Sequence, residues 1–291
     1  MIVVREAPAS SLPSPSGILP RARRENFVVA SLLLPPGARR HLIAIYGFAR
    51  LVDDIGDEVS GDRSAMLDSL ERELDAVYRG ELPRHPLMRR LVPTVRTLAL
   101  PSAPFHRLIE ANRRDQVTTR YQTYQDLLSY CELSANPVGH LVLHVFGAAT
   151  PHRVGLSDAI CTGLQLTEHW QDVAEDLARG RVYIPQEDMR RFGCSDADLS
   201  APKASRSLRR LVAFESGRAR ELLRQGAPLV PEMRGRARIA VAGFVAGGHA
   251  ALDAIERADH DVLAARPTPS RARRLRRLIE ELGRSRAVAR A

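Results

Sequence analysis

The chain has few cysteines, and these do not form a recognisable pattern. Its 291 residues contain three of them, Cys131, Cys161 and Cys194. They are too scattered for a structural zinc site, and their odd number does not suit a disulfide framework. We therefore expect the protein in a reducing compartment, the cytoplasm.

The chain also lacks a long hydrophobic run. Its first residues have no apolar core of the kind that a signal peptide requires. The longest weakly polar run, residues 239–252, contains His249 and several glycines. It is shorter than the roughly 20 apolar residues that span a bilayer. We expect a soluble protein, or one that makes peripheral contact with the inner face of the cell membrane.

Lysine is almost absent, and arginine supplies the positive charge. Lys203 is the only lysine among 43 basic residues, which exceed the 34 acidic ones and give a net charge of +9. Such an excess of positive charge suits an anionic partner. This partner can be nucleic acid, an acidic lipid surface or a diphosphate substrate. The arginine-rich segment 268–291 has no interleaved aromatic residues or nucleic-acid-binding motif. We expect this tail to be a basic helix at a lipid surface, with no nucleic-acid partner.

What is abundant is helical periodicity. Apolar residues recur at helical spacing from Glu25 onward, and β-type alternation is absent. We predict helices at roughly 38–55, 63–79, 86–98, 104–115, 123–131, 135–147, 155–177, 186–192, 205–225, 230–262 and 270–285. The predicted organisation is a flexible leader at residues 1–24, one all-α domain at residues 25–267, and a basic helical tail at residues 268–291.

A first acidic stripe follows the apolar run HLIAIYGF. On a helix, Tyr46, Arg50, Asp53 and Asp57 share one face, with Asp54 close by. Carboxylates one turn apart suit a hard cation such as Mg²⁺, and the arginine fork suits a phosphate. The alternative interpretation is a solvated acidic helix end.

A second acidic stripe consists of Gln165, Glu168, Asp172 and Asp176, spaced by three or four residues. Like charges on one helix face destabilise it by a few tenths of a kcal/mol per pair, which a bound divalent cation would relieve. The alternative is an exposed face of ion pairs. Two such stripes facing each other would hold two or three Mg²⁺ ions around a diphosphate. The metal would act as a Lewis acid, and an apolar cavity would shelter the resulting carbocation.

Four longer segments carry a family resemblance. They read ENFVVASLLLPPGARRHLIAIYGFARLVDDIGDE, DLLSYCELSANPVGHLVLHVFG, LQLTEHWQDVAEDLARGRVYIPQEDMRRFG and ALDAIERADHDVLAARPT. In this order they resemble the squalene and phytoene synthase family over residues 25–270. The resemblance implies a helical bundle of the isoprenoid-synthase type with a central cavity, and Mg²⁺-dependent chemistry on prenyl diphosphates.

The resemblance also implies roles for individual residues. The expected metal ligands are Asp53, Asp54, Asp57, Glu168, Asp172 and Asp176. The expected catalytic residues are Asp53, Asp57, Asp172, Asp176 and Tyr46. The expected substrate and diphosphate contacts are Arg50, Gln165, Arg181, Tyr183, Tyr130 and Asn136. His140 and His144 are one helical turn apart, but no further ligand follows in a zinc pattern, so we assign them to packing or to lining the substrate site.

Two motifs resemble one branch of the family. SANPVGH and LQLTEHWQDV are similar to bacterial hydroxysqualene synthases of hopanoid and squalene biosynthesis. The implied reaction converts presqualene diphosphate and water to hydroxysqualene and diphosphate, with no requirement for NADPH. Neighbouring enzymes of the squalene pathway are expected partners. The alternatives are a synthase of presqualene diphosphate or squalene that acts on farnesyl diphosphate, and a non-catalytic relative.

The sequence departs from the family pattern at three places. Glu168 stands where asparagine is usual, and Gln171 stands where arginine is common. Glu132 and Leu133 occupy positions where the family often has a second aromatic residue after Tyr130. The first change adds a negative charge to the second stripe, and the second removes a phosphate donor. These departures keep the non-catalytic alternative open.

Overall fold

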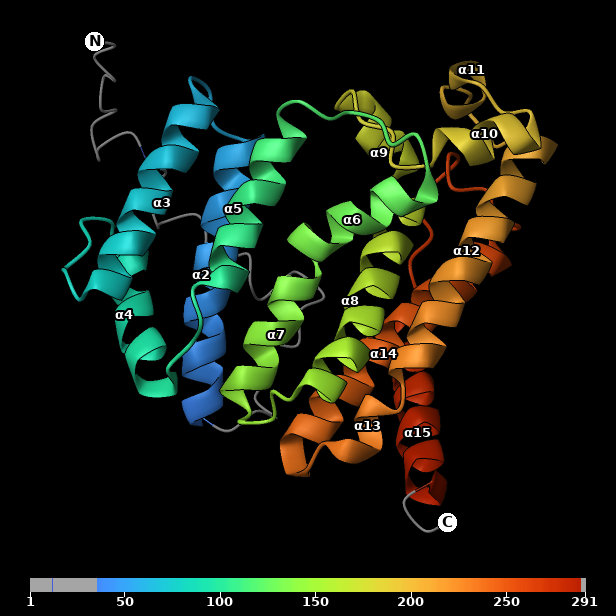
Figure 1. Cartoon of the computed structure of the whole chain (residues 1–291). Coiled ribbons are helices and arrows are strands. Elements are labelled where there is room, and N and C mark those ends of the chain that lie inside the picture. Colours follow the sequence, from blue (N-terminus) through green and yellow to red (C-terminus); the bar gives the residue numbers. More distant parts are fainter. Residues whose placement is uncertain (1–11, 13–35, 289–291) are drawn as a thin grey trace. The chain divides into compact units, whose positions relative to one another are not determined.

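The structure is a computed structural model that describes Leu12 and residues 36–288, without the side chains of residues 285–288 (Figure 1). Apart from Leu12, the predicted leader lies outside the described residues, and so does the start of the family resemblance at residues 25–35. The helices are α2 (Pro36–Asp57), α3 (Arg63–Arg79), α4 (Pro86–Leu98), α5 (Ala103–Asp115), α6 (Tyr124–Ser134), α7 (Asn136–Val145), α8 (Pro151–Gln171), α9 (Val173–Ala178), α10 (Gln186–Phe192), α11 (Asp196–Leu199), α12 (Arg206–Gly226), α13 (Leu229–Glu232), α14 (Gly235–Arg257) and α15 (Arg271–Val288). The predicted all-α class is confirmed, because β-pairing in the described chain is limited to one isolated bridge between Arg120 and Val182.

Local capping residues define several of the helix ends. Asp62 precedes α3, and its side chain accepts a hydrogen bond from the backbone N–H of Ala65. At the other end of α3, Gly80 adopts the left-handed conformation that suits a residue without a Cβ. A reciprocal capping box between Thr123 and Asp126 starts α6. The predicted boundaries of these helices therefore lie within a few residues of the observed ones.

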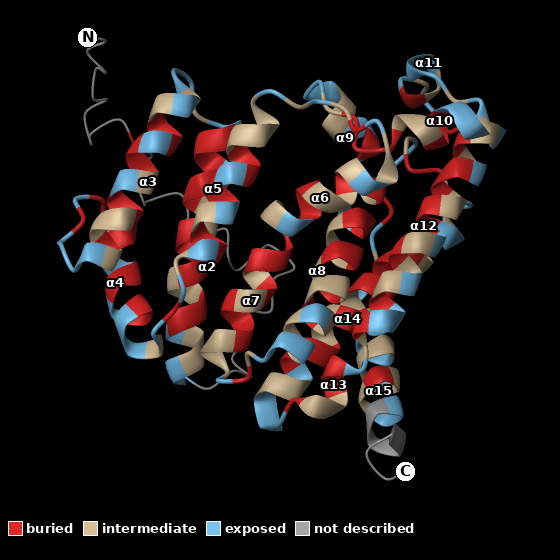
Figure 2. Ribbon diagram, in the orientation of Figure 1, coloured by how far each residue is buried: buried red, intermediate tan, exposed pale blue. Residues whose placement is uncertain are grey.

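The described chain forms two compact units. Unit 1 comprises the described residues up to Val117 together with His140–Ala149. In it, α2 packs against α3, α4 and α5. Phe48 on α2 meets Phe105 on α5 edge to face, with ring centroids 5.0 Å apart. The burial pattern in Figure 2 follows this packing, since the apolar side of α2 is buried.

Unit 2 comprises Thr118–Gly139 and the described residues from Thr150 onward. Helices α8 and α12 pack closely against each other, and α14 lies against both of them. Small residues make this approach feasible. A Cβ added at Gly226 would lie 2.4 Å from Ile160 Cγ1 and 2.6 Å from the carbonyl oxygen of Leu156. The C-terminal α15 packs along α14. Whether the two units fold as the single domain expected over residues 25–267 stays a prediction.

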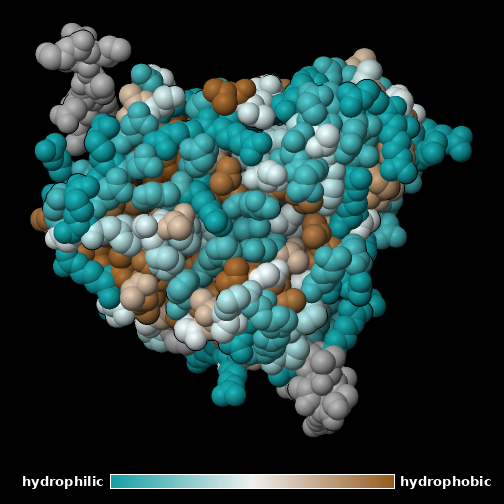
Figure 3. All heavy atoms as spheres, in the orientation of Figure 1, coloured by the Kyte–Doolittle hydropathy of each residue, from teal (hydrophilic) through white to brown (hydrophobic). Residues whose placement is uncertain are grey.

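Helix α14 is the one helix in the described chain whose length and composition would allow it to cross a membrane. Within it, 67% of the apolar window is buried, as in the core helix of a globular protein. It extends beyond the weakly polar run at residues 239–252 at both ends. Figure 3 shows mainly hydrophilic side chains on the face drawn, with hydrophobic ones visible between them.

Two predicted helices are divided in the structure, and one short observed helix was not predicted. The segment predicted as one helix over residues 155–177 is divided into α8 and α9 at Asp172. The segment 230–262 is divided before Gly235, whose φ of 54° is left-handed, and it ends at Arg257. Asp259 and His260 also have positive φ, which ends the helix there. The short helix α11 was not predicted, because a single turn has too little periodicity.

Candidate active site

The first acidic stripe lies on the last turns of α2, in unit 1. The helix is continuous from Pro36 to Asp57, so the predicted shared face of Tyr46, Arg50, Asp53 and Asp57 is confirmed. Tyr46 is buried, whereas Asp53 and Asp57 are exposed. The end of α2 is held by Arg63, which donates from Nη2 to the carbonyl oxygen of Asp57 at 3.0 Å. This contact satisfies a carbonyl that the helix itself leaves without a donor.

Arg50 and Asp54 lie together on α2. Arg50 Nε is 2.7 Å from Asp54 Oδ1, and Arg50 Nη2 is 2.6 Å from Glu58 Oε1. Asp54 is buried in this pairing, unlike its neighbours in the stripe. Asp54 therefore orients the guanidinium of Arg50, whereas the carboxylates of Asp53 and Asp57 are exposed; metal binding by all three stays a prediction.

Asp53 is positioned by α5. Asn112 Nδ2 donates to Asp53 Oδ1 at 3.4 Å and to the carbonyl oxygen of Leu108 at 3.3 Å. Gln116 Nε2 donates to the carbonyl oxygen of Gly56 at 3.1 Å. A Cβ at Gly56 would lie 2.0 Å from Asn112 Oδ1. Gly56 thus allows α5 to approach α2 closely enough for Asn112 to reach Asp53.

The electrostatic environment of Asp53 opposes ionisation. Desolvation by the surrounding protein raises the pKa of Asp53, and the negative charges of Asp57 and Asp54 raise it further. The hydrogen bond from Asn112 and the charge of Arg50 act in the opposite direction. The carboxylate keeps an exposed surface, so water screens these charges and limits the shift. A cation bound beside Asp53 and Asp57 would relieve the repulsion between them.

The second acidic stripe lies where α8 gives way to α9, in unit 2. Asp172 occupies the break with φ of −107° and ψ of 15°. The amide of Asp172 still bonds to the carbonyl of Glu168, and that of Asp176 to the carbonyl of Asp172. The spacing of the three carboxylates is therefore retained across the break, although the helix is not continuous.

The segment after α14 contacts this break. Arg266 pairs with Asp172 through two contacts. Its Nε contacts Asp172 Oδ1, and its Nη2 donates to Asp172 Oδ2 at 2.7 Å. Gln171 Nε2 donates to the carbonyl oxygen of Pro267. Desolvation and the charges of Glu168 and Asp176 together raise the pKa of Asp172 to about 6, although Arg266 opposes them. Gln171, which departs from the family's arginine, thus anchors a segment that brings another arginine to the stripe.

Aromatic rings gather beside the second stripe. His169 stacks on Tyr183 with centroids 3.7 Å apart, and its Nε2 lies 3.1 Å from the amide nitrogen of Gln165. His169 Nδ1 is 3.9 Å from Asp176 Oδ2. Tyr183 also stacks on Tyr121, and Tyr130 lies 5.8 Å from Tyr183 between ring centroids. Glu132 and Leu133 stand where a second aromatic residue was expected after Tyr130. The aromatic neighbours of Tyr130 come instead from other segments.

Two further predicted residues have clear places in unit 2. Asn136 begins α7, directly after the break that follows α6, and its Oδ1 accepts a hydrogen bond from Thr162 Oγ1 at 3.0 Å. Arg181 lines a small hollow together with His169, Asp176 and Tyr183. Arg181 and Tyr183 therefore lie near the second stripe, and their role as substrate contacts stays a prediction.

Sequence reasoning did not identify three of these neighbours. Arg266, His169 and Tyr121 all lie within contact of residues that it did identify. His169 falls inside the motif LQLTEHWQDV, so its position next to Gln165 and Asp172 was available as a signal. Arg266 and Tyr121 come from distant segments and carry no local pattern.

The donor atoms of both stripes suit a divalent cation. Both offer oxygen donors alone, with carboxylates repeated at helical spacing, and in both a carboxylate has its pKa raised partly by neighbouring carboxylates. Within the described residues no three Asp, Glu, His or Cys side chains are arranged as a complete metal cage. Mg²⁺ commonly binds through one or two carboxylates, waters and substrate phosphate, so a complete cage is not required. That the two stripes face each other stays a prediction.

Comparison with known proteins supports the family resemblance. Over 264 residues the chain is 33% identical to a 15-cis-phytoene synthase of Synechocystis sp., which covers 85% of this chain and 78% of that protein. It is 36% identical over 217 residues to a hydroxysqualene synthase of Rhodopseudomonas palustris, covering 73% of this chain and 72% of that protein.

A solved structure shares both fold and sequence. The crystal structure of squalene synthase HpnC from Alicyclobacillus acidocaldarius superposes with a TM-score of 0.77 and 42% identity, over 88% of this chain and 97% of that one. A sequence profile described as squalene/phytoene synthase matches residues 20–274. Since this match spans most of the chain, and both acidic stripes fall within it, the protein belongs to the squalene/phytoene synthase family.

Proposed function

We propose that this protein is a hydroxysqualene synthase that converts presqualene diphosphate and water to hydroxysqualene and diphosphate. Proteins of its family bind prenyl diphosphates and typically depend on a divalent metal. The observation that carries the proposal is the pair of oxygen-rich acidic stripes, each accompanied by an arginine, in a chain 42% identical to squalene synthase HpnC. Mg²⁺ would neutralise the charge that develops on the departing diphosphate.

In this proposal the arginines bind the diphosphate. Arg50 and Arg266 are each held by an aspartate, which orients a guanidinium of the kind that binds phosphate oxygens. The exposed carboxylates Asp53 and Asp57 hold the metal on α2, and Glu168, Asp172 and Asp176 hold it at the α8–α9 break. Glu168 in place of an amide contributes one more negative charge to that set.

The aromatic cluster suits the cationic stage of the reaction. When the C–O bond to diphosphate breaks, its electron pair leaves with the diphosphate, and the C30 skeleton becomes a carbocation. Aromatic faces stabilise a nearby cation, and Tyr121, Tyr130 and Tyr183 are buried, which excludes bulk water from them. The rearranged cation then forms a C–O bond with one water molecule, which releases a proton and yields the alcohol.

Substrate preference tests this assignment. The purified protein is incubated with Mg²⁺ and either presqualene diphosphate or farnesyl diphosphate, without NADPH, and the products are identified by mass spectrometry. We expect hydroxysqualene from presqualene diphosphate, and no product when EDTA replaces Mg²⁺. Consumption of farnesyl diphosphate alone would show that the assignment is wrong.

A second candidate is the condensation of two prenyl diphosphates. The similarity to a phytoene synthase over 85% of the chain favours this class. Presqualene diphosphate or a related C–C coupled product from farnesyl diphosphate would then appear in the same assay. A non-catalytic relative would release no diphosphate from either substrate, and its Glu168→Asn variant would release none either.

We also propose that the protein is cytoplasmic and contacts the inner face of the membrane through α15. Leu275 and Ile279 lie one turn apart on this helix and are 58% and 63% exposed. Arg273 and Arg276 are exposed near them. Apolar side chains flanked by arginines are typical of a helix that lies at an anionic lipid surface. Such a location would place the enzyme near its lipid substrate and near other enzymes of the squalene pathway.

A further inference from the structure

A hollow in unit 2 is lined by residues that belong to neither acidic stripe. It is bounded by α12, α14 and α15, and its volume is about 330 Å³. The residues that line it are Gly217, Arg220, Glu221, Arg224, His249, Arg277 and Arg284. Four guanidiniums and a single carboxylate therefore surround a space large enough for a small ligand. None of these residues takes part in the site proposed above.

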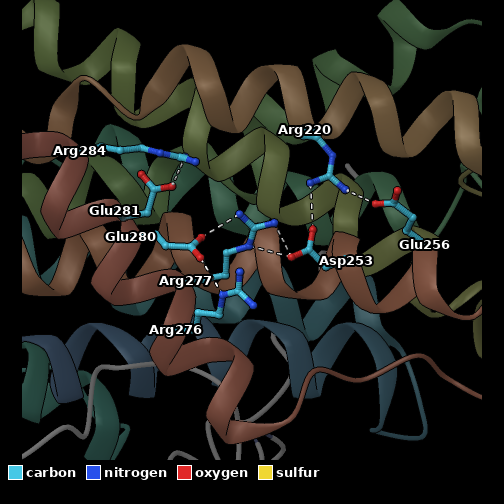
Figure 4. Close-up of polar contacts among 8 residues, drawn as sticks. All are labelled: Arg220, Asp253, Glu256, Arg276, Arg277, Glu280, Glu281 and Arg284. Carbon is cyan, nitrogen blue, oxygen red and sulfur yellow. Dashed lines mark hydrogen bonds and ion pairs between the residues drawn. The ribbon is translucent and has the colours of Figure 1, made fainter.

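Carboxylates around the hollow hold two of its arginines in place (Figure 4). Arg220 Nη1 donates to Asp253 Oδ1 at 3.1 Å, and Arg277 Nε donates to Asp253 Oδ2 at 2.7 Å. Arg220 also contacts Glu256, and Arg277 also contacts Glu280. The three contacts to Asp253 and Glu256 connect α12, α14 and α15, whereas the contact between Arg277 and Glu280 lies within α15. The guanidiniums are thus oriented in advance, and the carboxylates that orient them are not among the residues lining the hollow.

The other two arginines pair with carboxylates of their own helices. Arg284 uses Nη1 for Glu281 at 3.1 Å, which leaves its remaining N–H groups for a ligand. Arg224 pairs with Glu221 on its own helix. Neither of these contacts joins one helix to another. These contacts of Arg224 and Arg284 therefore do not hold α15 on the unit.

His249 provides an independent indication of a ligand. It lines the hollow from α14, is only 9% exposed, and has no hydrogen-bond partner among the described residues. Its ring nitrogens are not enclosed by protein, so they are accessible from the hollow. Burial and the charges of Arg220, Arg277 and Arg284 together lower the pKa of His249 to about 4, although Asp253 opposes them. The ring is neutral at pH 7 and can donate one hydrogen bond to an anion.

We propose that this hollow is a second anion site, which binds a phosphate or diphosphate group through Arg220, Arg224, Arg277 and Arg284, with His249 as a further donor. An ion-pair clamp between helices would require neither the hollow nor the unpartnered imidazole. The phosphate can belong to a free anion or to a phospholipid headgroup. Leu275 and Ile279 are about half a helical turn away from Arg277 around α15, so the site is distinct from the membrane contact proposed above.

Binding of the free anions is measured first. Inorganic diphosphate and phosphate are titrated into the protein by calorimetry in EDTA, which removes metal-dependent binding at the acidic stripes. A double variant, Arg224→Gln with Arg284→Gln, should weaken binding at least about tenfold, because it removes two charge-assisted donors. The matched control is Arg276→Gln, which alters an exposed arginine of α15 outside the hollow and should leave binding unchanged. Thermal unfolding checks that each variant is folded.

Two further measurements, an NMR titration of His249 and a vesicle sedimentation assay, test whether an anion binds in the hollow and whether it is a lipid headgroup. In the wild type, the bound anion should raise the pKa of His249, measured from its imidazole NMR signals, because it offsets the charge of the arginines. If free anions do not bind, sedimentation with phosphatidylcholine vesicles containing phosphatidic acid tests the headgroup as the source. Vesicle binding lost in the double variant and kept in Arg79→Gln, which alters an exposed arginine of α3 in unit 1, would support that form of the site. No binding in either assay, or equal binding by wild type and double variant, would overturn the proposal.

Discussion

At the scale of single residues, Gly56 controls the position of Asp53. A Gly56→Ala substitution would place a Cβ 2.0 Å from Asn112 Oδ1, so Asn112 must move away from Asp53. We expect the free energy of unfolding to fall by about 1–3 kcal/mol, as for overpacking in a core. Denaturant unfolding measures this loss, and diphosphate release measures the effect on Asp53.

Gly37 is the control on the same helix. A Cβ there meets no atom within 4 Å, so Gly37→Ala should be neutral or slightly stabilising. Equal unfolding midpoints for the two variants would contradict the role given to Gly56.

Arg266 is the second residue with a specific role. Replacing it with alanine removes the cation that pairs with Asp172, so the pKa of Asp172 should rise above about 6. It would also remove a diphosphate donor. We expect diphosphate release to slow by about tenfold to a hundredfold, the effect of losing a hydrogen bond to a charged group.

Arg179→Ala provides the comparison for Arg266. Arg179 lies at the end of α9 and pairs only with Glu175 at the surface, so its loss should leave the rate close to that of the wild type. A normal rate in Arg266→Ala would exclude Arg266 from the site.

At the scale of elements, the contact between α10 and α12 depends on pH. Glu215 is buried, and Arg218 Nη1 lies 3.1 Å from its Oε1 and 2.6 Å from Asp188 Oδ2. Desolvation raises the pKa of Glu215 from 4.5 to about 8, although Arg218 opposes this. The folded state then holds a proton that the unfolded state has lost, so stability falls as pH rises from about 4.5 to about 8.

A Glu215→Gln variant tests this dependence, because glutamine does not ionise. The melting temperature of the wild type, relative to that of the variant, should decrease between pH 5 and pH 8. On the same helix, Glu221 has its pKa lowered to about 2, so Glu221→Gln should show a constant difference across this range. Parallel curves for wild type and Glu215→Gln would contradict the assigned shift.

At the scale of the whole molecule, we expect the protein to bind membranes through the exposed side chains Leu275 and Ile279 of α15. A double variant, Leu275→Ser with Ile279→Ser, should bind anionic vesicles several-fold more weakly than the wild type, because two exposed apolar side chains are lost. Sedimentation at low and at high salt measures both this loss and the electrostatic part. Leu82→Ser, at an equally exposed leucine of unit 1, is the control. Vesicle binding unaffected in the α15 variant would rule out this helix as the contact.

The amino-acid sequence by itself determined the helical class, most helix boundaries and the family. These follow from local properties, namely apolar periodicity, capping residues such as Asp62 and Thr123, and the spacing of Asp53 and Asp57 on one face. Because such properties involve residues a few positions apart, they can be read without knowledge of the fold.

Only the tertiary structure decided which distant residues share a site. It brought Arg266 to Asp172, Asn112 to Asp53, and Tyr121 to Tyr183, and it divided the predicted helix 155–177 at Asp172. Each of these contacts joins segments far apart in the chain, so no local periodicity encodes it. The arginine-lined hollow has the same origin, since its guanidiniums come from α12 and α15 and converge only when both helices pack against α14.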